Sequence, residues 1–293
     1  MALEAYLIHI LILVGIYIIL ALALQLAMGF TGLLNIGHVA FYGIGAYTSA
    51  LLALNLGVPF WFGLIIGGLV ASIFGILLAI PTTKLKGDYL AIGTLGFAII
   101  IFSILQNWIS LTNGPLGLPG IPKPILFGFK FTGFSYLILV YVFVLITYWI
   151  VKKIVKSPFG RVLKAVKDDE LAASSLGKNP IKYKIIAFAV SAFLAGIAGS
   201  LYAHYISFID PSSFTILESI LIISMVIIGG LGSIGGAIFG AAFLILIQEP
   251  IRFLPLPSSV LGALRQMIYS GLLIILLIFK PKGLWGGKNA SRN

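Results

Sequence analysis

The stretch AYLIHILILVGIYIILALALQLAM, residues 5–28, decides the fold class of this chain. It contains no Asp, Glu, Lys or Arg, and it opens a run of 79 consecutive residues, between Glu4 and Lys84, that lacks all four. A helix needs about 20 apolar residues to cross the hydrocarbon core of a bilayer. We therefore expect three membrane spans in this run, at residues 5–28, 37–56 and 60–80.

The composition of the whole chain agrees with that expectation. Hydrophobic residues make up 60% of the 293 residues and charged residues 9%, whereas a soluble globular protein has roughly 25% charged residues. The chain has no cysteine, which excludes disulfide scaffolds, thiolate zinc sites and iron–sulfur clusters. We predict an all-α polytopic membrane bundle that forms one transmembrane domain over residues 1–293.

Further apolar stretches predict spans at residues 89–111, 134–151, 185–206 and 261–279. Residues 112–133, rich in glycine and proline, are expected to form a loop. The uncharged stretch 219–248 is interrupted by GGLGSIGG at residues 229–236. This break leaves two short halves, which are either brief spans or a re-entrant pair. The bundle is thus expected to have about eight or nine spans, with a glycine-broken segment near residues 229–236.

The positive charges predict the orientation. Segment 152–184 holds nine Lys and Arg, the tail from Lys280 four, and the turn at Lys84 and Lys86 two, while the loops on the other side hold four. Because Lys and Arg are retained on the cytoplasmic side of a membrane, we expect segment 152–184 and the C-terminus to be cytoplasmic and the N-terminus to be outside. The net charge of +11 is then explained without nucleic acid.

Segment 152–184 is predicted to be a cytoplasmic loop with its own helices. Ser157 and Pro158 suit a helix start, and apolar residues at helical spacing lie beside Arg161. The acidic run Asp168-Asp169-Glu170 precedes a second short helix, which Gly177 should end. The residues alone leave two roles open for this segment: docking of a partner protein, or contact with anionic lipid. Simple helix capping is favoured over a metal site at the acidic run, since no histidine lies nearby.

Missing motifs bear on the energy source. The chain has no Gly-x-x-x-x-Gly-Lys-Ser/Thr phosphate loop. Its acidic residues, among them Asp210 and Glu218, fall at the expected span edges, which disfavours an ion relay within the membrane. If the chain pumps a solute, its energy should come from another chain. A carrier that binds sodium through backbone carbonyls would escape this test. We expect no catalytic residues, no metal and no cofactor, and hence no enzyme.

Two glycine breaks predict the transport path. GLLNIGHVAF at residues 32–41 matches GLGSIGGAIF at residues 230–239 in five positions, with a constant offset of 198. Unwound membrane segments in corresponding parts of a transporter point to its path. An internal repeat and a coincidence in a glycine-rich chain both remain open. For His38, a structural hydrogen bond is the alternative to solute contact. The path residues proposed on this basis are Asn35, Gly37, His38, Gly232, Ser233 and Gly235.

Several segments resemble the M-type permease subunit of branched-chain amino acid ABC importers. The resemblance rests on GFTGLLNIGHVAFYGIGAY at residues 29–47, KGDYLAIGTLGF at 86–97, LTNGP at 111–115, residues 160–177, and SAFLAGIAG at 191–199. It implies alternating access in the inner membrane of a prokaryote. It also implies four partners: a second homologous permease, two cytoplasmic ATPases and an external solute-binding protein.

The resemblance also favours ATPase docking for the cytoplasmic segment. Ala172-Ala173-x-x-x-Gly177 resembles the coupling motif of ABC importers, although Leu171 occupies the position before the alanines where Glu is usual. It implies a coupling role for Arg161, Glu170, Ala172, Ala173 and Gly177.

The resemblance implies branched-chain, hydrophobic amino acids as substrates. Ile99 and Phe102 stand where the family often has Glu and Arg. Urea, short amides and simple sugars are therefore kept as alternative substrates, and a stand-alone carrier or channel as the alternative class.

Overall fold

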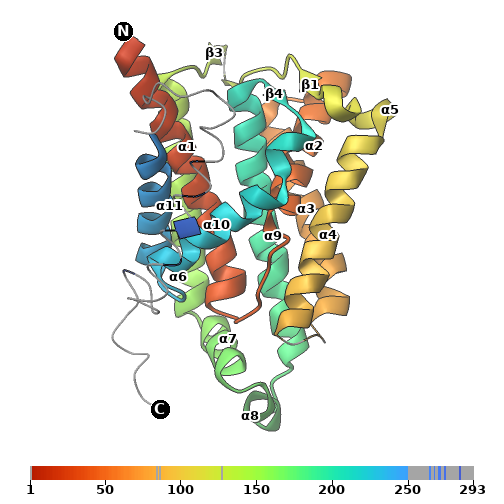
Figure 1. Ribbon diagram of the computed structural model, residues 1–293, viewed down its shortest axis with the longest axis vertical. Coiled ribbons are helices and arrows are strands. Elements are labelled where there is room, and N and C mark those ends of the chain that lie inside the picture. The colour runs from red at the N-terminus through yellow and green to blue at the C-terminus, as the bar shows by residue number, and fades with distance from the viewer. Residues whose placement is uncertain are drawn as a thin grey trace.

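A computed structural model describes residues 2–83, 85, 87–126 and 128–249, together with residues 264, 267, 270, 271, 274 and 284. Over this part of the chain the fold is a bundle of long helices (Figure 1). Seven helical segments are long and apolar enough to cross a membrane, and an eighth, Ile234–Gln248, is apolar but shorter. The predicted polytopic helical bundle is confirmed. The last expected span, residues 261–279, lies outside the described residues apart from isolated positions.

The helices follow one another in the order of the spans, with short helices between them. Their bounds are α1 Ala2–Leu24, α2 His38–Leu56, α3 Phe60–Thr82, α4 Asp88–Asn107, α5 Ile109–Thr112, α6 Phe134–Lys156, α7 Pro158–Asp168, α8 Glu170–Ser175, α9 Pro180–Ile206, α10 Ile216–Gly229 and α11 Ile234–Gln248. A π-helical turn, η1 (Gln25–Gly29), extends α1, and 3-10 turns occur at η2 (Gly114–Leu116) and η3 (Pro211–Phe214).

Four helix boundaries differ from the sequence prediction. Helix α3 runs through Pro81 to Thr82, although proline lacks the N–H group that a helical hydrogen bond needs. Helix α4 ends at Asn107, and α5 follows after a break. Helix α6 continues past residue 151 to Lys156, and α9 begins at Pro180 instead of residue 185. The hydropathy of a sequence indicates where a helix leaves the membrane. The helix itself can continue into water until a capping residue ends it.

Helix α9 lies at the centre and packs against α2 and α3 (Figure 1). Small residues allow this contact: a Cβ atom on Gly196 would lie 2.7 Å from the Ala71 side chain and 2.9 Å from the Gly67 carbonyl oxygen. In a membrane, the burial of apolar side chains contributes little to helix association, because lipid tails are also apolar. Helices associate instead through the van der Waals contacts that close approach allows. Helix α1 packs on α6, α9, α10 and α11.

The connection between α1 and α2 is not helical. Figure 1 shows the chain turning back at the lower end of α1 and rising along the bundle before α2 begins. Asn35 and His38, on this connection and at the start of α2, have no exposed surface. Non-helical backbone at membrane depth is tolerated where it is buried in protein or lines a cavity. The predicted first glycine break is therefore real and internal.

The second glycine break joins two short antiparallel helices. Helices α10 and α11 have 14 and 15 residues, which correspond to about 21 and 22 Å against a hydrocarbon core of about 30 Å. They pack closely, since a Cβ atom on Gly240 would lie 3.0 Å from the Gly229 nitrogen. Gly230 and Gly232 take positive φ values of 110° and 82° in the turn. The predicted break into two halves is confirmed. With η3, α10 forms the segment Pro211–Gly229, which is long enough to cross a membrane, whereas α11 is shorter.

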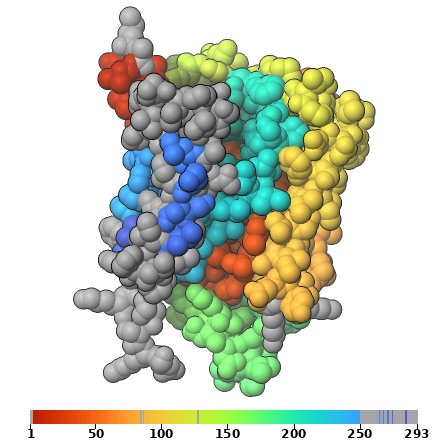
Figure 2. Space-filling view, viewed as in Figure 1, coloured from red at the N-terminus to blue at the C-terminus, as the bar shows by residue number. Residues whose placement is uncertain are grey.

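Short strands close the end of the bundle opposite α8. Strand β1 (Leu118–Pro119) pairs antiparallel with β4 (Phe208–Ile209), and β2 (Ile125–Leu126) pairs with β3 (Phe129–Lys130). The predicted loop 112–133 thus contains one small ladder and one strand of another. At the other end, α7 and α8 project beyond the long helices, as the green atoms at the bottom of Figure 2 show.

Candidate functional site

The projecting α7–α8 unit, residues 158–175, is built from two capped helices. The Ser157 hydroxyl accepts a hydrogen bond from the Gly160 nitrogen at 3.3 Å and caps α7. The Asp169 carboxylate accepts from the backbone nitrogens of Leu171 and Ala172 at 2.9 and 3.0 Å and caps α8. Both caps satisfy N–H groups that a helix start leaves unpaired. The predicted pair of short helices is confirmed.

Gly177 ends α8, as predicted. Its φ of +74° is left-handed, and the Gly177 and Lys178 nitrogens donate to the carbonyl oxygens of Ser174 (2.9 Å) and Ala173 (3.2 Å). This pair of bonds is the Schellman ending, which favours glycine at its left-handed position. A Cβ atom at Gly177 would meet nothing within 4 Å. The glycine is therefore needed for its backbone conformation and not for space.

An ion pair ties α8 to α9. The Lys184 ammonium lies 2.7 Å from a Glu170 carboxylate oxygen, with the lysine side chain 7% exposed and the glutamate 30%. Ala173 is also buried, whereas Arg161 and Ala172 are exposed. The five predicted coupling residues thus have different positions. Glu170, Ala173 and Gly177 hold the unit in shape, and Arg161 and Ala172 lie on its surface.

The outer side of α8 is apolar and uncovered among the described residues. Leu171 is 75% exposed and Leu176 is 79% exposed. A groove of about 470 Å³ runs between α8 and the start of α9, lined by Glu170, Leu171, Ser174, Lys178, Asn179, Pro180 and Ile181. Two leucines held out at the tip of a projecting unit have the character of a protein contact surface.

The α7–α8 unit is also bonded to the end of α1. The Lys167 ammonium donates a hydrogen bond to the Gly29 carbonyl oxygen at 2.8 Å, and the Lys164 ammonium lies 5.7 Å from the centre of the Phe30 ring. Gly29 closes the π-helical turn, which often marks a functional site in a helix. The first glycine break therefore begins where α7 makes contact.

The second glycine break meets the same turn. The Gln25 amide nitrogen donates to the carbonyl oxygens of Gly230 and Ser233, both at 3.0 Å. A Cβ atom on Gly29 would lie 2.8 Å from the Gly232 nitrogen. Ser233 itself caps α11 by accepting from Gly236 at 3.1 Å. The turn at Gln25–Gly29 is thus the junction of α7 and both breaks.

The first break carries buried polar groups without partners. Both side-chain polar atoms of Asn35 are buried and make no hydrogen bond within the part of the chain that the structure describes, and the buried His38 ring lies near the Leu20 carbonyl group. The backbone between them is held by Thr94, whose hydroxyl accepts from the Ile36 nitrogen at 3.0 Å, and by Ser219, which donates to the Ile36 oxygen. Buried polar groups usually have partners, so these two residues are suited to bind a polar solute or water.

The predicted path residues fall in two groups. Asn35, Gly37 and His38 are buried, whereas Gly232 and Gly235 are exposed and Ser233 is half-buried. Across the described residues no hydrogen bond joins the two groups directly. Gln25 bonds the second group to the end of α1, and sequence reasoning missed it because glutamine in an apolar helix has no motif. Its position inside a charge-free run was the only signal.

Glu218 was also missed. It lies in the first turn of α10, and the Tyr17 hydroxyl, in the middle of α1, donates to its carboxylate. The Tyr42 ring is 5.5 Å from that of Tyr202 and 5.1 Å from that of Phe214, and the buried Tyr42 hydroxyl has no partner among the described residues. The sequence analysis placed Glu218 at a span edge, and the structure has it in the first turn of α10. Its contact with Tyr17 in the middle of α1 is what the sequence did not indicate.

Comparison with known proteins gives one family. The model of the branched-chain amino acid transport system / permease component matches residues 6–277. The high-affinity branched-chain amino acid transport system permease protein LivM of Escherichia coli is 38% identical over 92% of this chain and 67% of its own length, and that of Salmonella typhimurium is 37% identical over the same shares.

A more distant relative is named for the import of a different solute. The autoinducer 2 import system permease protein LsrC of Salmonella paratyphi B is 30% identical over 71% of this chain and 59% of its own length. No solved structure matches the chain. The family match and the seven apolar helices describe a multi-pass membrane protein. The chain belongs to the family of branched-chain amino acid transport permease components.

Proposed function

We propose that this chain is the membrane-spanning permease subunit of an ATP-driven importer for branched-chain amino acids. One observation carries the proposal: a capped helical unit projects from the bundle, exposes Leu171 and Leu176, and is bonded through Lys167 to the point where both glycine breaks meet. Such a unit is suited to receive motion from another protein. The branched-chain amino acid transport for which the LivM relatives are named supports the substrate class.

The orientation follows from the charges. Segment 152–184 carries nine Lys and Arg and includes the α7–α8 unit, so this end is cytoplasmic, the N-terminus is outside, and the membrane is the inner membrane of a prokaryote. The chain performs no chemistry itself. Two cytoplasmic ATPases bind the α7–α8 unit, a second homologous permease completes the path, and an external binding protein delivers the amino acid.

Five residues couple ATP hydrolysis to the bundle. Arg161 and Ala172 form the contact surface together with the two exposed leucines, and Ala173 packs beneath it. Glu170, through Lys184, and Gly177, through its left-handed turn, keep α8 in place. Movement of the unit pulls on Gly29 through Lys167 and shifts the two breaks against each other.

The path runs beside the unwound segments. Asn35 and His38 supply buried polar groups, Gly37 lies between them, and Gly232, Ser233 and Gly235 belong to the turn that meets η1. Glu218 adds a carboxylate that matches the ammonium group of an amino acid. Charged side chains within a membrane bundle usually mark the route of a substrate.

The experiment is uptake by the assembled importer. The chain is co-expressed with its neighbouring transport genes, purified in mild detergent, identified with its companions by mass spectrometry, and reconstituted with labelled leucine outside. ATP-dependent uptake by a complex with two ATPases supports the proposal. Uptake of urea, a short amide or a sugar in place of leucine would overturn the proposed substrate class. Uptake by the purified chain alone, without ATP, would overturn the importer and favour a stand-alone carrier.

A further inference from the structure

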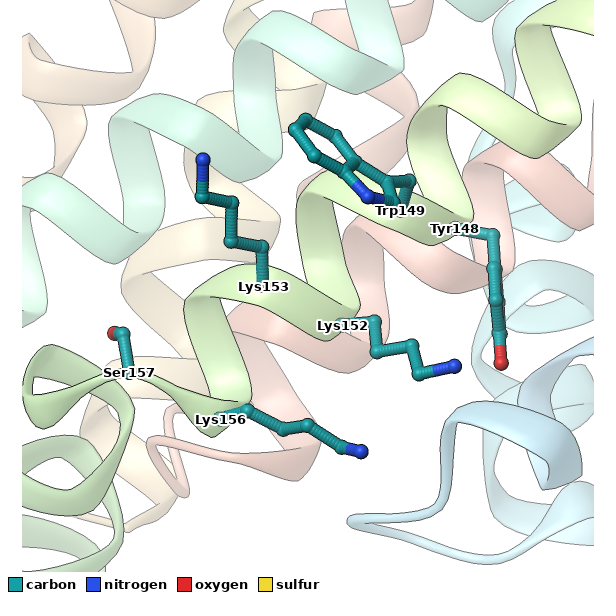
Figure 3. Close-up of a pocket in the computed structure, with 6 residues that line it drawn as sticks. All are labelled: Tyr148, Trp149, Lys152, Lys153, Lys156 and Ser157. Carbon is teal, nitrogen blue, oxygen red and sulfur yellow. The ribbon is translucent and has the colours of Figure 1, made fainter.

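The last turns of α6 carry a groove that lies apart from both glycine breaks and from the exposed side of α8. It encloses about 560 Å³ and is lined by Tyr148, Trp149, Lys152, Lys153, Lys156 and Ser157. Figure 3 shows Lys152 and Lys156 extending to one side of α6 and Lys153 to the other, beside Trp149. Apart from Ser157, which caps α7, the uptake mechanism proposed above uses none of these side chains.

The groove has a surplus of positive charge. Aromatic rings hold two of its ammonium groups: Lys152 lies 5.0 Å from the centre of the Tyr148 ring, and Lys153 lies 4.7 Å from that of Trp149. Within the described ranges, no carboxylate forms an ion pair with Lys152, Lys153 or Lys156. Lys152 and Lys156 extend to the same side of α6, which favours an anionic occupant there, because each ammonium group gains from a shared counter-charge.

The carboxylates nearest along the chain are engaged elsewhere. Asp168 forms no ion pair with the groove lysines among the described residues, Asp169 accepts hydrogen bonds from the first nitrogens of α8, and Glu170 pairs with Lys184. These acids therefore do not supply the counter-charge for the groove.

An apolar face continues from the groove along α6. Val142 and Ile146 are both 45% exposed, Leu145 is 66% exposed and Trp149 is 60% exposed. These side chains follow one another toward the start of the helix and end at the aromatic pair above the lysines. Trp and Tyr mark the interface of a bilayer, with apolar residues on the hydrocarbon side and Lys on the headgroup side. The occupant should therefore combine a negative group with long apolar chains.

We propose that this groove binds the headgroup phosphate of an anionic glycerophospholipid, with its acyl chains along the exposed face of α6. The charge selects an anion, and the continuous apolar face selects a lipid over free phosphate. Ser157 lines the groove and also caps α7. The bound lipid therefore steadies the point where the α7–α8 unit leaves the membrane.

Trp149 provides the test. The full chain is placed in nanodiscs of phosphatidylcholine with increasing phosphatidylglycerol that carries brominated acyl chains, which quench nearby tryptophan. The signal is the quenching in the unaltered chain minus that in Trp149→Phe. In the unaltered chain we expect half-maximal quenching at low phosphatidylglycerol content. Each lysine that is removed should raise the phosphatidylglycerol content needed for half-maximal quenching about fivefold. The variants are Lys152→Gln, Lys156→Gln and a triple variant that adds Lys153→Gln to both.

The matched control removes three charges from the same end of the bundle. Lys164→Gln, Lys178→Gln and Lys182→Gln are combined, and quenching should stay as in the unaltered chain. A monodisperse peak in size-exclusion chromatography and an unchanged helical circular-dichroism spectrum establish that each variant folds. If the triple variant does not fold, the single variants still test the proposal, because each should lose part of the quenching.

Three results would overturn the proposal. The first is equal quenching in the triple variant and the unaltered chain. The second is equally strong quenching by brominated phosphatidylcholine, which would remove the selectivity for negative charge. The third is displacement of the lipid by an equal concentration of inorganic phosphate, which would show a free-anion site. Because uptake is not measured, the result does not depend on the proposed substrate.

Discussion

The Lys167 ammonium donates a hydrogen bond to the Gly29 carbonyl oxygen at 2.8 Å. The two residues are 138 positions apart, one on the projecting α7 and one in the π-helical turn that ends α1. The same turn touches the α10–α11 break through Gln25 and Gly29. One lysine therefore connects the surface proposed to meet the ATPases with both unwound segments, and the bond can be removed without altering either end.

Lys167→Met should weaken coupling more than stability. A hydrogen bond from a charged donor is worth about 1.5–3 kcal/mol when buried, and less here because water reaches the lysine. We expect the reconstituted importer to hydrolyse ATP normally while the amount of leucine taken up per ATP falls severalfold. Lys164→Met, which removes a charge one turn earlier, is the control and should retain most uptake. Equal loss in both variants would contradict a specific role for the bond to Gly29.

Gly177 should tolerate asparagine better than valine. Its φ of +74° costs a β-branched residue more than asparagine, which enters the left-handed region readily. Because a Cβ atom there meets nothing, the difference measures backbone strain alone. We expect Gly177→Val to insert into the membrane yet to uncouple ATP hydrolysis from uptake, and Gly177→Asn to stay coupled. Normal coupled uptake by Gly177→Val would remove Gly177 from the coupling residues.

Removal of one partner of the Glu170–Lys184 ion pair should destabilise the chain more than removal of both partners. Glu170→Gln leaves a lysine with a 7% exposed side chain without its counter-charge, which should cost about 1–3 kcal/mol. Adding Lys184→Met removes the stranded ammonium and should restore part of the loss. Thermal unfolding of the purified chain in detergent measures all three variants. A double variant less stable than Glu170→Gln would show that Lys184 acts through another contact.

Glu218→Gln tests the proposed path. The amide keeps an oxygen that can accept from the Tyr17 hydroxyl but removes the negative charge that an ammonium group would meet. We expect leucine uptake at low concentration to fall by about tenfold or more, in line with the loss of one charged hydrogen bond of about 1.5–3 kcal/mol. Tyr17→Phe, which keeps the charge, should lose less. Unchanged uptake by Glu218→Gln would place this carboxylate off the path.

Sequence reasoning found the helical bundle and the two short helices of the α7–α8 unit because their signals are local. A charge-free run identifies a span, a serine before a proline identifies the start of α7, and Gly177 identifies the end of α8. Each of these depends on neighbours within about one turn of the chain. Helix ends beyond the membrane were misjudged because Lys152 to Lys156 is polar yet helical.

The contacts that join the site were not predictable in the same way. Lys167 to Gly29, Gln25 to Gly230 and Tyr17 to Glu218 span between 138 and 205 positions. Nothing in one sequence indicates which polar residue of a helix faces which other helix. The suggested internal repeat remains a prediction, although its two glycine segments meet at one turn.

The small size of α8 has a consequence for how such a complex is built. Six residues cannot hold a helix in water by themselves, so α8 depends on the Asp169 cap, the Gly177 ending and the ion pair to α9. Its outer leucines are therefore in position only after α6 and α9 have been inserted and have closed on one another. A partner that recognises this surface selects finished bundles, and a synthetic peptide of residues 158–177 would compete poorly for it. Complex assembly would thus include only membrane subunits that have already folded.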